Sequence, residues 1–363
     1  MKRKGTSLAG AFFLLFGVFL LLLLLINSEI AMDGVRRGLS LCTETLFPSL
    51  FPFLVLSELL VAAGAGQTLG RLFSRPVSAL FGLSERGTAA FLLGSLCGFP
   101  IGTTTAVALY EKGEIGKQEL DRLMLFANNP SSGFLVSAVG EALFGSRSAG
   151  IALFVITLLS AILIAAFLRL LCGKLPQPPR NPSDGAKKQL CASDITGSVR
   201  RGFSSLLQVM AFVLFFSCVS ACLSAVVQDL GLPEEGGVLL CGLLELTAGI
   251  SRAVTTLSPA AAFRASAFFS GFAGLSVCLQ LFSVAEKQNP HLLQYLLSRT
   301  AQGCLALLLA QGYLLLFRPD FLTAESVDST PLASAPQLSI PLLLLGLFLL
   351  LAASLVWRKK KKA

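Results

Sequence analysis

The chain has 363 residues, of which 54% are hydrophobic and 13% are charged, and its mean hydropathy is +0.76. A soluble domain carries about 25% charged residues, so the composition excludes that class and indicates a membrane protein. The net charge of +9 comes almost wholly from basic clusters at 2–4 and 358–362. Such clusters beside apolar runs mark cytoplasmic ends and contact membrane lipid. The interior lacks the basic stripe with interleaved aromatics that nucleic-acid binding requires.

Apolar segments predict ten helices. In chain order they cover 8–27, 39–63, 88–110, 120–144, 148–171, 203–228, 236–257, 262–286, 291–317 and 338–357. Most approach the roughly 20 residues that a spanning helix needs. The first is longer than a usual signal core and no Ala-x-Ala site follows it, which favours an uncleaved signal-anchor over a signal peptide. The stretch 71–83 is shorter and amphipathic, and we expect it at the membrane interface.

The charges of two loops predict the topology. The loop 173–202 is basic and is expected in the cytoplasm, whereas 318–337 is acidic and suits the outer side, with both termini inside. The chain must then cross the membrane an even number of times before the first loop, but five apolar segments precede that loop. It must cross an odd number of times between the two loops, but four apolar segments lie between them. Both counts agree with the loop charges if one segment of each half enters the membrane and returns to the same side. We expect 39–63 and 203–228 to be these re-entrant segments.

These two segments share a short repeat. Val-Arg-Arg-Gly occurs at 35–38 and again at 199–202, and each copy opens a half with the same order of segments. The fold class predicted is therefore an all-α polytopic membrane protein with about eight spanning helices, two re-entrant hairpins and inverted repeats. Its parts are a signal-anchor 1–34, a first repeat 35–172, a cytoplasmic linker 173–198, a second repeat 199–317, and the outer loop, last helix and basic tail 318–363. Against the positive-inside trend, this scheme puts Arg36, Arg37, Arg71 and Arg75 outside.

Three segments predict interruptions of helices inside the membrane. Asn128–Gly133 contains Pro130, which removes a backbone donor and clashes with the preceding turn. Unwound backbone at membrane depth is tolerated only where protein buries it or where it lines a wet cavity, so such a break points to a binding site. Gly98–Thr105 is a second punctuated segment, and Ser270–Ser276, which leads toward Gln280, is its counterpart in the second half. A plain proline kink or close helix packing explains these patterns almost as well.

Glu245 is the clearest ionisable residue within an apolar run, and Arg252 follows seven residues later on the same predicted helix face. Its role is either a structural ion pair with Arg252 or a ligand for substrate, proton or cation. Glu44 and Gln208 occupy equivalent places in the two repeat copies, where snorkelling is the competing interpretation for Glu44. The residues expected to bind substrate or ion are Glu245, Asn128, Asn129, Ser131, Ser132, Thr103, Thr104, Thr105, Glu44, Gln208 and Glu58. The structural breaks are expected at Pro48, Pro52, Pro100, Pro130, Gly98, Gly102, Gly271 and Gly274.

Catalysis and metal binding find little support in the sequence. There are nine cysteines but no Cys-x-x-Cys, and His291 is the single histidine, so the cysteines are expected to fill space in helices. No nucleophile–base pair and no phosphate-binding glycine loop is recognisable, so we expect no enzyme activity and no metal or other cofactor. Na⁺ or H⁺ coupling and a homo-oligomer remain open.

The ordered motifs between about 35 and 300 resemble the nucleoside-recognition, or Gate, membrane family, and within it the sporulation integral membrane proteins of the YlbJ type. The resembling pieces are Leu46–Phe53 with Glu58, Gly98–Gly102, Phe126–Ser131, Leu244–Gly249 and Gly271–Ser276. The resemblance implies a role in spore cortex or envelope formation and a distant likeness to concentrative nucleoside transporters. The function expected is transport of a small polar solute, which is nucleoside-like if the family name applies. The alternative is a non-transporting scaffold in spore assembly.

Overall fold

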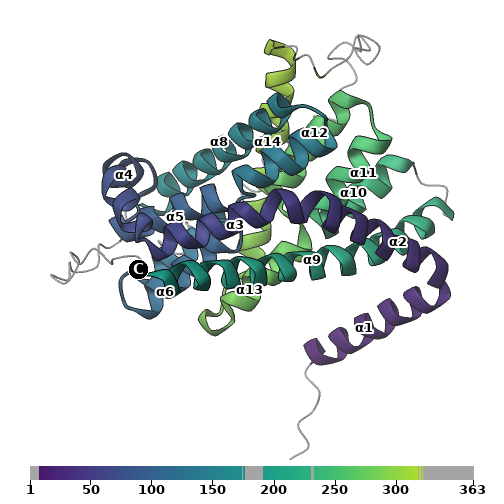
Figure 1. Cartoon of the computed structure of the whole chain (residues 1–363), viewed down its shortest axis with the longest axis horizontal. Coiled ribbons are helices and arrows are strands. Elements are labelled where there is room, and N and C mark those ends of the chain that lie inside the picture. The colour runs from purple at the N-terminus through teal and green to yellow at the C-terminus, as the bar shows by residue number, and fades with distance from the viewer. Residues whose placement is uncertain are drawn as a thin grey trace, which may run out of the picture.

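The computed structural model describes residues 8–173, 175, 191–229, 233–317, 319 and 321, and every regular element in these ranges is helical (Figure 1). The predicted helix 338–357, the basic tail and nearly all of the outer loop 318–337 lie outside the described residues. The fold class is therefore all-α, as the composition predicts.

The helices fall into long rods and short segments. The bounds are α1 Leu8–Ile26, α2 Ser28–Ser40, η1 Leu41–Leu46, α3 Phe47–Ala62, α4 Ala65–Phe81, α5 Glu85–Cys97, α6 Ile101–Glu111, α7 Lys117–Phe126, η2 Phe134–Leu143, α8 Arg147–Cys172, α9 Ala192–Asp229, α10 Glu234–Leu244, α11 Leu246–Thr256, α12 Pro259–Phe272, α13 Gly274–Val284, η3 Glu286–Gln288 and α14 Leu292–Phe317. Five stretches are long and apolar enough to cross a membrane: Ser28–Ala62, Arg147–Cys172, Ala192–Asp229, Pro259–Val284 and Leu292–Phe317.

Two of these rods form a long antiparallel pair, and this corrects the predicted positions of the hairpins. Helices α2, η1 and α3 run on without reversal over 35 residues, and α9 is a single helix of 38 residues. Neither 39–63 nor 203–228 is therefore a hairpin. Pro48 and Pro52 lie within this continuous helix, and the wider π-helical turns of η1 directly precede Pro48 and accommodate it. The last eleven residues of the predicted loop 173–202 also belong to a helix, because α9 begins at Ala192.

Small residues bring the two rods together. A Cβ atom on Gly34 would lie 2.8 Å from the Ala221 Cβ, and one on Gly202 would lie 3.0 Å from the Val55 backbone N. The two contacts lie at opposite ends of the pair, because α9 runs antiparallel to α2 and α3 (Figure 1). Close backbone approach of this kind is how helices associate in lipid, where no hydrophobic driving force acts between them.

The chain reverses direction at two other segments, each predicted as a single span. Helices α5 and α6 pack against each other as a hairpin, with Gly94 and Gly102 in close contact. Helices α10 and α11 form a second hairpin, in which a Cβ on Gly249 would lie 2.1 Å from the Gly242 Cα. Gly98 allows the first reversal, because its φ of +86° is accessible to glycine at little cost. The two hairpins come from opposite ends of the molecule (Figure 1).

Each hairpin is followed by a broken helix, and both breaks fall in segments where the sequence predicts them. The second break corresponds to the Asn128–Gly133 break and not to Gly98–Thr105, its predicted counterpart, because Gly98 lies at a hairpin tip. Helix α7 ends at Phe126, and the chain becomes helical again at Ser132 before the π-helical η2. Helix α12 ends at Phe272 and α13 begins at Gly274, with Ala273 at φ 74° between them. The first break contains Pro130, whereas the second depends on a left-handed residue and has no proline.

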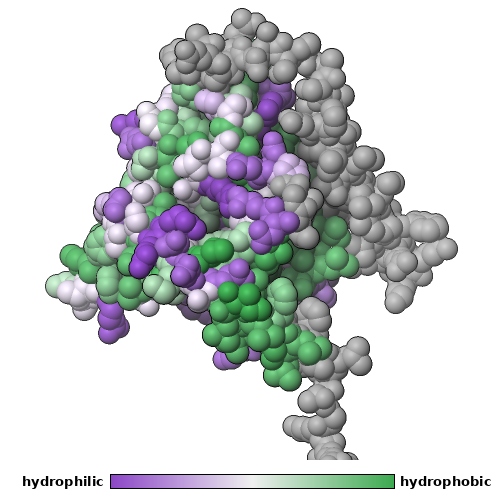
Figure 2. Space-filling view, turned by 90° about the vertical axis from the view of Figure 1, so that its right-hand side faces the viewer, coloured by the Kyte–Doolittle hydropathy of each residue, from purple (hydrophilic) through white to green (hydrophobic). Residues whose placement is uncertain are grey.

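The remaining elements fit a membrane protein. Helix α4 is amphipathic and exposes Leu72, Phe73 and Leu80, and it is longer than the predicted 71–83. All nine cysteines are unpaired and seven of them are buried, in agreement with space-filling roles. Hydrophilic residues gather on the end of the molecule that Figure 2 shows, where α2, α10 and α11 lie, and hydrophobic residues flank them.

Candidate functional site

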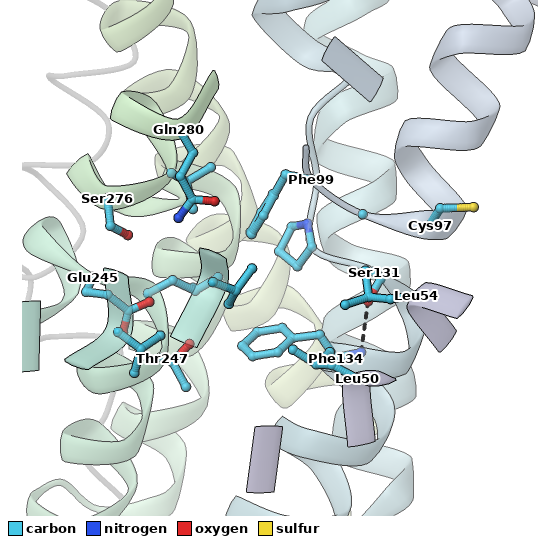
Figure 3. A pocket seen from close by; sticks show the side chains of 16 residues that line it. Leu50, Leu54, Cys97, Phe99, Ser131, Phe134, Glu245, Thr247, Ser276 and Gln280 are labelled. Carbon is cyan, nitrogen blue, oxygen red and sulfur yellow. Dashed lines mark hydrogen bonds between the residues drawn. The ribbon is translucent and has the colours of Figure 1, made fainter. Parts of the chain in front are cut away.

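A cavity lies where both hairpin tips and both helix breaks meet (Figure 3). The first hairpin and the first break contribute Cys97, Gly98, Phe99, Pro130, Ser131 and Phe134, and the second hairpin and the second break contribute Glu245, Leu246, Thr247, Ser276, Val277 and Gln280. Leu50 and Leu54 of α3 and Val209 and Val213 of α9 complete the wall. The volume is about 40 Å³, which in this conformation accommodates a few water molecules or an ion rather than a nucleoside.

The tip of the first hairpin packs directly on the first break. A Cβ atom on Gly98 would lie 2.8 Å from both the backbone N and the Cβ of Ser131, so only glycine fits there. The Ser131 hydroxyl accepts a hydrogen bond of 3.1 Å from the Phe134 N–H and thereby caps the helix that resumes after the break. The Phe99 ring and Ser131 form the side of the cavity opposite Glu245 in Figure 3.

The tip of the second hairpin is Glu245 itself. Its backbone is extended, and its Oε2 accepts a hydrogen bond of 2.6 Å from the Ala248 N–H at the start of α11. The side chain is 3% exposed, and the positive end of the α11 dipole favours a negative charge there. Gly274, after the second break, lies against this tip, with its Cβ position 3.3 Å from the Glu245 Cα. The second half thus repeats the contact between tip and break that the first half makes.

Of the two interpretations of Glu245, the ion pair with Arg252 is absent from the described residues. The predicted single helix 236–257 would have put the two side chains on one face, but the chain turns back at Glu245. Arg252 reaches the neighbourhood of Gly237 and of the Cys241 Sγ instead. The structural ion-pair interpretation of Glu245 is therefore wrong, and its carboxylate faces the cavity.

Asn128 and Asn129 hold the first break together without lining the cavity. The Asn128 Oδ1 accepts hydrogen bonds from the Thr103 N–H at 3.0 Å and from the Thr103 hydroxyl at 2.7 Å. The Asn129 Nδ2 donates to the Phe126 carbonyl at 2.9 Å, and both asparagines are buried. They satisfy the backbone groups that the break leaves free, so they position Pro130 and Ser131 beside the cavity.

A buried arginine on α14 links the two breaks, and the sequence analysis did not single it out. Arg299 is fully buried, and its Nη1 donates to the Gln302 Oε1 at 2.6 Å. Gln302 in turn donates to the Asn129 Oδ1 at 2.8 Å, whereas the Arg299 Nε faces the Phe272 carbonyl at the end of α12, 3.5 Å away. Among the described residues no carboxylate pairs with Arg299. A basic residue in the middle of the apolar segment 291–317 was the signal available for finding it.

Other predicted site residues lie away from the cavity. Glu44 and Gln208 are exposed on the outer face of the rod pair. Glu58 forms an ion pair of 2.7 Å with Arg201. The Thr104 hydroxyl bonds to the Pro100 carbonyl and the Ser132 hydroxyl to the Leu96 carbonyl, and Thr105 is not part of the cavity wall. Thr247, Ser276 and Gln280 line the cavity and were not among the predicted ligands. Figure 3 shows them on the same side as Glu245.

The polar groups of the cavity define what it can hold. One carboxylate, three hydroxyls and one amide project among mainly apolar walls, and Glu245 is the single charged group in the wall. An ionised carboxylate only accepts hydrogen bonds, so it selects a cation or a neutral group with N–H or O–H donors. No nucleophile and base come together in this wall.

These features define a multi-pass α-helical membrane protein whose candidate site is built from helix ends in its interior. Over 352 residues, the chain is 26% identical to the "Sporulation integral membrane protein YlbJ" of Bacillus subtilis (strain 168), a match that covers 88% of this chain and 84% of that protein. The similarity supports assignment of the chain to the YlbJ type, as the resemblance predicted. No family model matches, so membership of the Gate family stays a prediction, and no solved structure matches.

The hydrogen bonds that link the two breaks predict that substitutions of two glutamines on α14 lower the free energy of unfolding by different amounts. Gln302→Leu removes the acceptor of a fully buried guanidinium, and an uncompensated buried charge costs about 3–5 kcal/mol. Gln311→Leu removes a similar bond, 2.8 Å from the Arg264 Nη1, but that pair is only partly buried and its loss costs about 1 kcal/mol. Thermal unfolding in one detergent measures both, and equal shifts would contradict the structural role of Gln302.

Proposed function

We propose that this protein binds a small polar solute in the cavity between the hairpin tips and moves it across the membrane in the course of sporulation. The observation that carries the proposal is the meeting of two hairpin tips and two helix breaks, one of each from either half of the chain. Helix ends and unwound backbone at membrane depth are found where protein lines a cavity for a solute or ion. The sporulation role rests on the similarity to the sporulation integral membrane protein of Bacillus subtilis.

An inverted topology supports the proposal. If α5–α6 and α10–α11 are the re-entrant hairpins, the numbers of crossings agree with the charges of the loops, as the parity argument requires. The rod Ser28–Ala62 then crosses, which brings Arg71 and Arg75 of α4 to the cytoplasmic side and removes an exception to the positive-inside trend. The two halves enter the membrane in opposite directions, and both termini are cytoplasmic in the plasma membrane.

The cavity favours a ligand with a cationic group or with hydrogen-bond donors, because Glu245 is its charged group. Proton or Na⁺ coupling through this carboxylate belongs to the same proposal, because an intramembrane carboxylate exchanges either ion more readily than a neutral side chain does. A nucleoside requires a wider conformation than the one described, since the present cavity of about 40 Å³ is too small for it.

The proposal predicts that Glu245→Gln lowers ligand affinity at least tenfold, a loss of about 1.4 kcal/mol. A thermal-shift screen against nucleosides, amino acids and ions identifies the ligand, because a ligand that binds the folded state raises its unfolding temperature. Asn129→Ala should also weaken binding, because it releases the break that positions Ser131.

Glu141→Gln is the matched control, because Glu141 is exposed and faces Arg147 away from the cavity. It should bind the ligand as the unsubstituted protein does. Unchanged affinity in Glu245→Gln, or a complete lack of stabilising ligands, would contradict the proposal.

The alternative function is a membrane scaffold that recruits partners during spore assembly. It predicts that sporulation tolerates Glu245→Gln and fails when the linker 173–191 is replaced by a sequence of equal length. The tight packing of helix breaks around a cavity favours the transporter, because a scaffold has no need of buried polar groups at interrupted helices.

A second copy of the chain is the partner that the rod pair suggests. The contact of 3.9 Å between the Cys42 Sγ and the Met210 carbonyl sets Glu44 and Gln208 at one level near the middle of both rods. Both side chains are exposed, and among the described residues the Glu44 carboxylate has no partner. A carboxylate facing lipid there is costly. We propose that a two-fold-related copy covers this face, with Glu44 of each copy accepting from the Gln208 amide of the other.

This interface predicts that Glu44→Ala converts the oligomer to monomers. Glu29→Ala is the control, because Glu29 is also an exposed acid of the same rod but lies near its end. Native mass spectrometry from nanodiscs measures the copy number. A monomeric unsubstituted protein, or an oligomer that survives Glu44→Ala, would rule out this interface.

A further inference from the structure

A second hollow lies between α4 and the end of α8, far from the hairpin tips. Its volume is about 650 Å³, and it is lined by Ser74, Arg75, Ser78, Ala79, Leu83, Glu85 and Arg169. The hollow is shallow and widely open, so it suits a group that lies against the protein surface rather than an enclosed ligand. Unlike the central cavity, its wall carries two guanidinium groups.

The two arginines lack the anion that such groups usually bind. Within the described part of the chain neither Arg75 nor Arg169 forms an ion pair, and the Arg169 Nε is buried without a hydrogen-bond partner. Glu85 is the acid in the wall, but its carboxylate is taken by the Arg71 Nε at 3.2 Å. Arg122 is close enough to repel Arg169, and its own Nη1 donates to the Gly173 carbonyl at 2.9 Å. Positive charge is therefore in excess around the hollow.

The backbone around the hollow holds Arg169 in place. Gly82 has a φ of +71°, and a Cβ atom there would lie 2.7 Å from the Arg169 Cδ. The arginine stem thus passes over a glycine that has no room for a side chain. This contact fixes the guanidinium in the wall rather than leaving it free in solvent.

The position of the hollow indicates the kind of anion. It lies beside α4, which exposes Leu72, Phe73 and Leu80 as an apolar face suited to the acyl boundary of a bilayer. It also adjoins Gly173, where the basic linker begins. Anionic lipid enriches a cytoplasmic surface and attracts basic groups there, and guanidinium binds phosphate oxygens bidentately.

We propose that this hollow binds the phosphate group of an anionic phospholipid, held by Arg75 and Arg169 with the Ser78 hydroxyl as a further donor. The acyl chains lie along the apolar face of α4. The lipid thereby fixes α4 against α5 and α8 at the membrane surface. This inference takes the cytoplasmic placement of α4 from the proposed topology, but it does not depend on transport or on the central cavity.

Native mass spectrometry and thermal unfolding of the purified full chain test the proposal, with phosphatidylglycerol as the anionic probe and phosphatidylcholine as the zwitterionic one. We expect phosphatidylglycerol to bind and to raise the unfolding temperature, and Arg169→Gln and Arg75→Gln each to weaken its binding about fivefold. Arg75 is exposed, so its substitution leaves the fold intact even if Arg169→Gln disturbs it.

Arg147→Gln is the matched control, because it removes the same charge from the opposite end of α8, where the side chain is 74% exposed. It should leave lipid binding unchanged. Three results would overturn the proposal: equal binding of both lipids, an equal loss in Arg147→Gln, or inorganic phosphate that stabilises the protein as strongly as the lipid does. The last result would identify a site for a soluble anion.

Discussion

Interrupting a helix inside a bilayer frees backbone N–H and C=O groups that lipid cannot satisfy, and the rest of this structure depends on how they are capped. The Asn128 Oδ1 accepts from the N–H of Thr103 near the start of α6. The Glu245 carboxylate accepts from the N–H of Ala248 at the start of α11. The Asn129 amide and the Ser298 hydroxyl donate to carbonyls at the end of α7. Several residues that the sequence suggests as ligands are therefore also caps, and these caps offset the free-energy cost of the breaks.

The same caps connect the two halves of the chain. Gln302 of α14 bonds to Asn129 of the first break, and Arg299 beside it faces the last carbonyl of α12 at the second break. A fully buried guanidinium is an expensive group, and here it supplies a fixed positive charge at the negative end of a helix. A movement that opened one break would disturb the bonds of the other. In the proposed transport, this coupling would make the two halves around the cavity change together.

Local patterns predicted the fold class and the breaks, because composition and proline act locally. Pro130 placed the first break correctly, and Gly271–Ser276 placed the second. The parity count requires one returning segment in each half, a role that the proposed topology gives to α5–α6 and α10–α11 instead of the predicted hairpins. Their location was wrong because Pro48 and Pro52 were taken as chain-reversing, whereas the π-helical turns before Pro48 let the rod continue.

The residues around the cavity were harder to predict, because packing between distant segments decides which side chains face it. Glu245 and Ser131 line the cavity, whereas the side-chain amides of Asn128 and Asn129 donate to backbone carbonyls of α7. Glu44 and Gln208, which the sequence suggests as equivalent positions, are both exposed and lie outside the cavity wall. Glu245 and Arg252 do not form an ion pair, because a spacing of seven residues places two side chains on one face only within a continuous helix. The chain reverses at Glu245.

The central claim is that two helical hairpins enter the membrane from opposite sides and meet at their tips. Cysteine accessibility in a variant without the nine native cysteines tests it most directly. Gly113→Cys, at the open end of α5–α6, should react with an impermeant thiol reagent from the cytoplasmic side only. Thr256→Cys, at the open end of α10–α11, should react from the outer side only. Labelling of both positions from the same side would contradict the account.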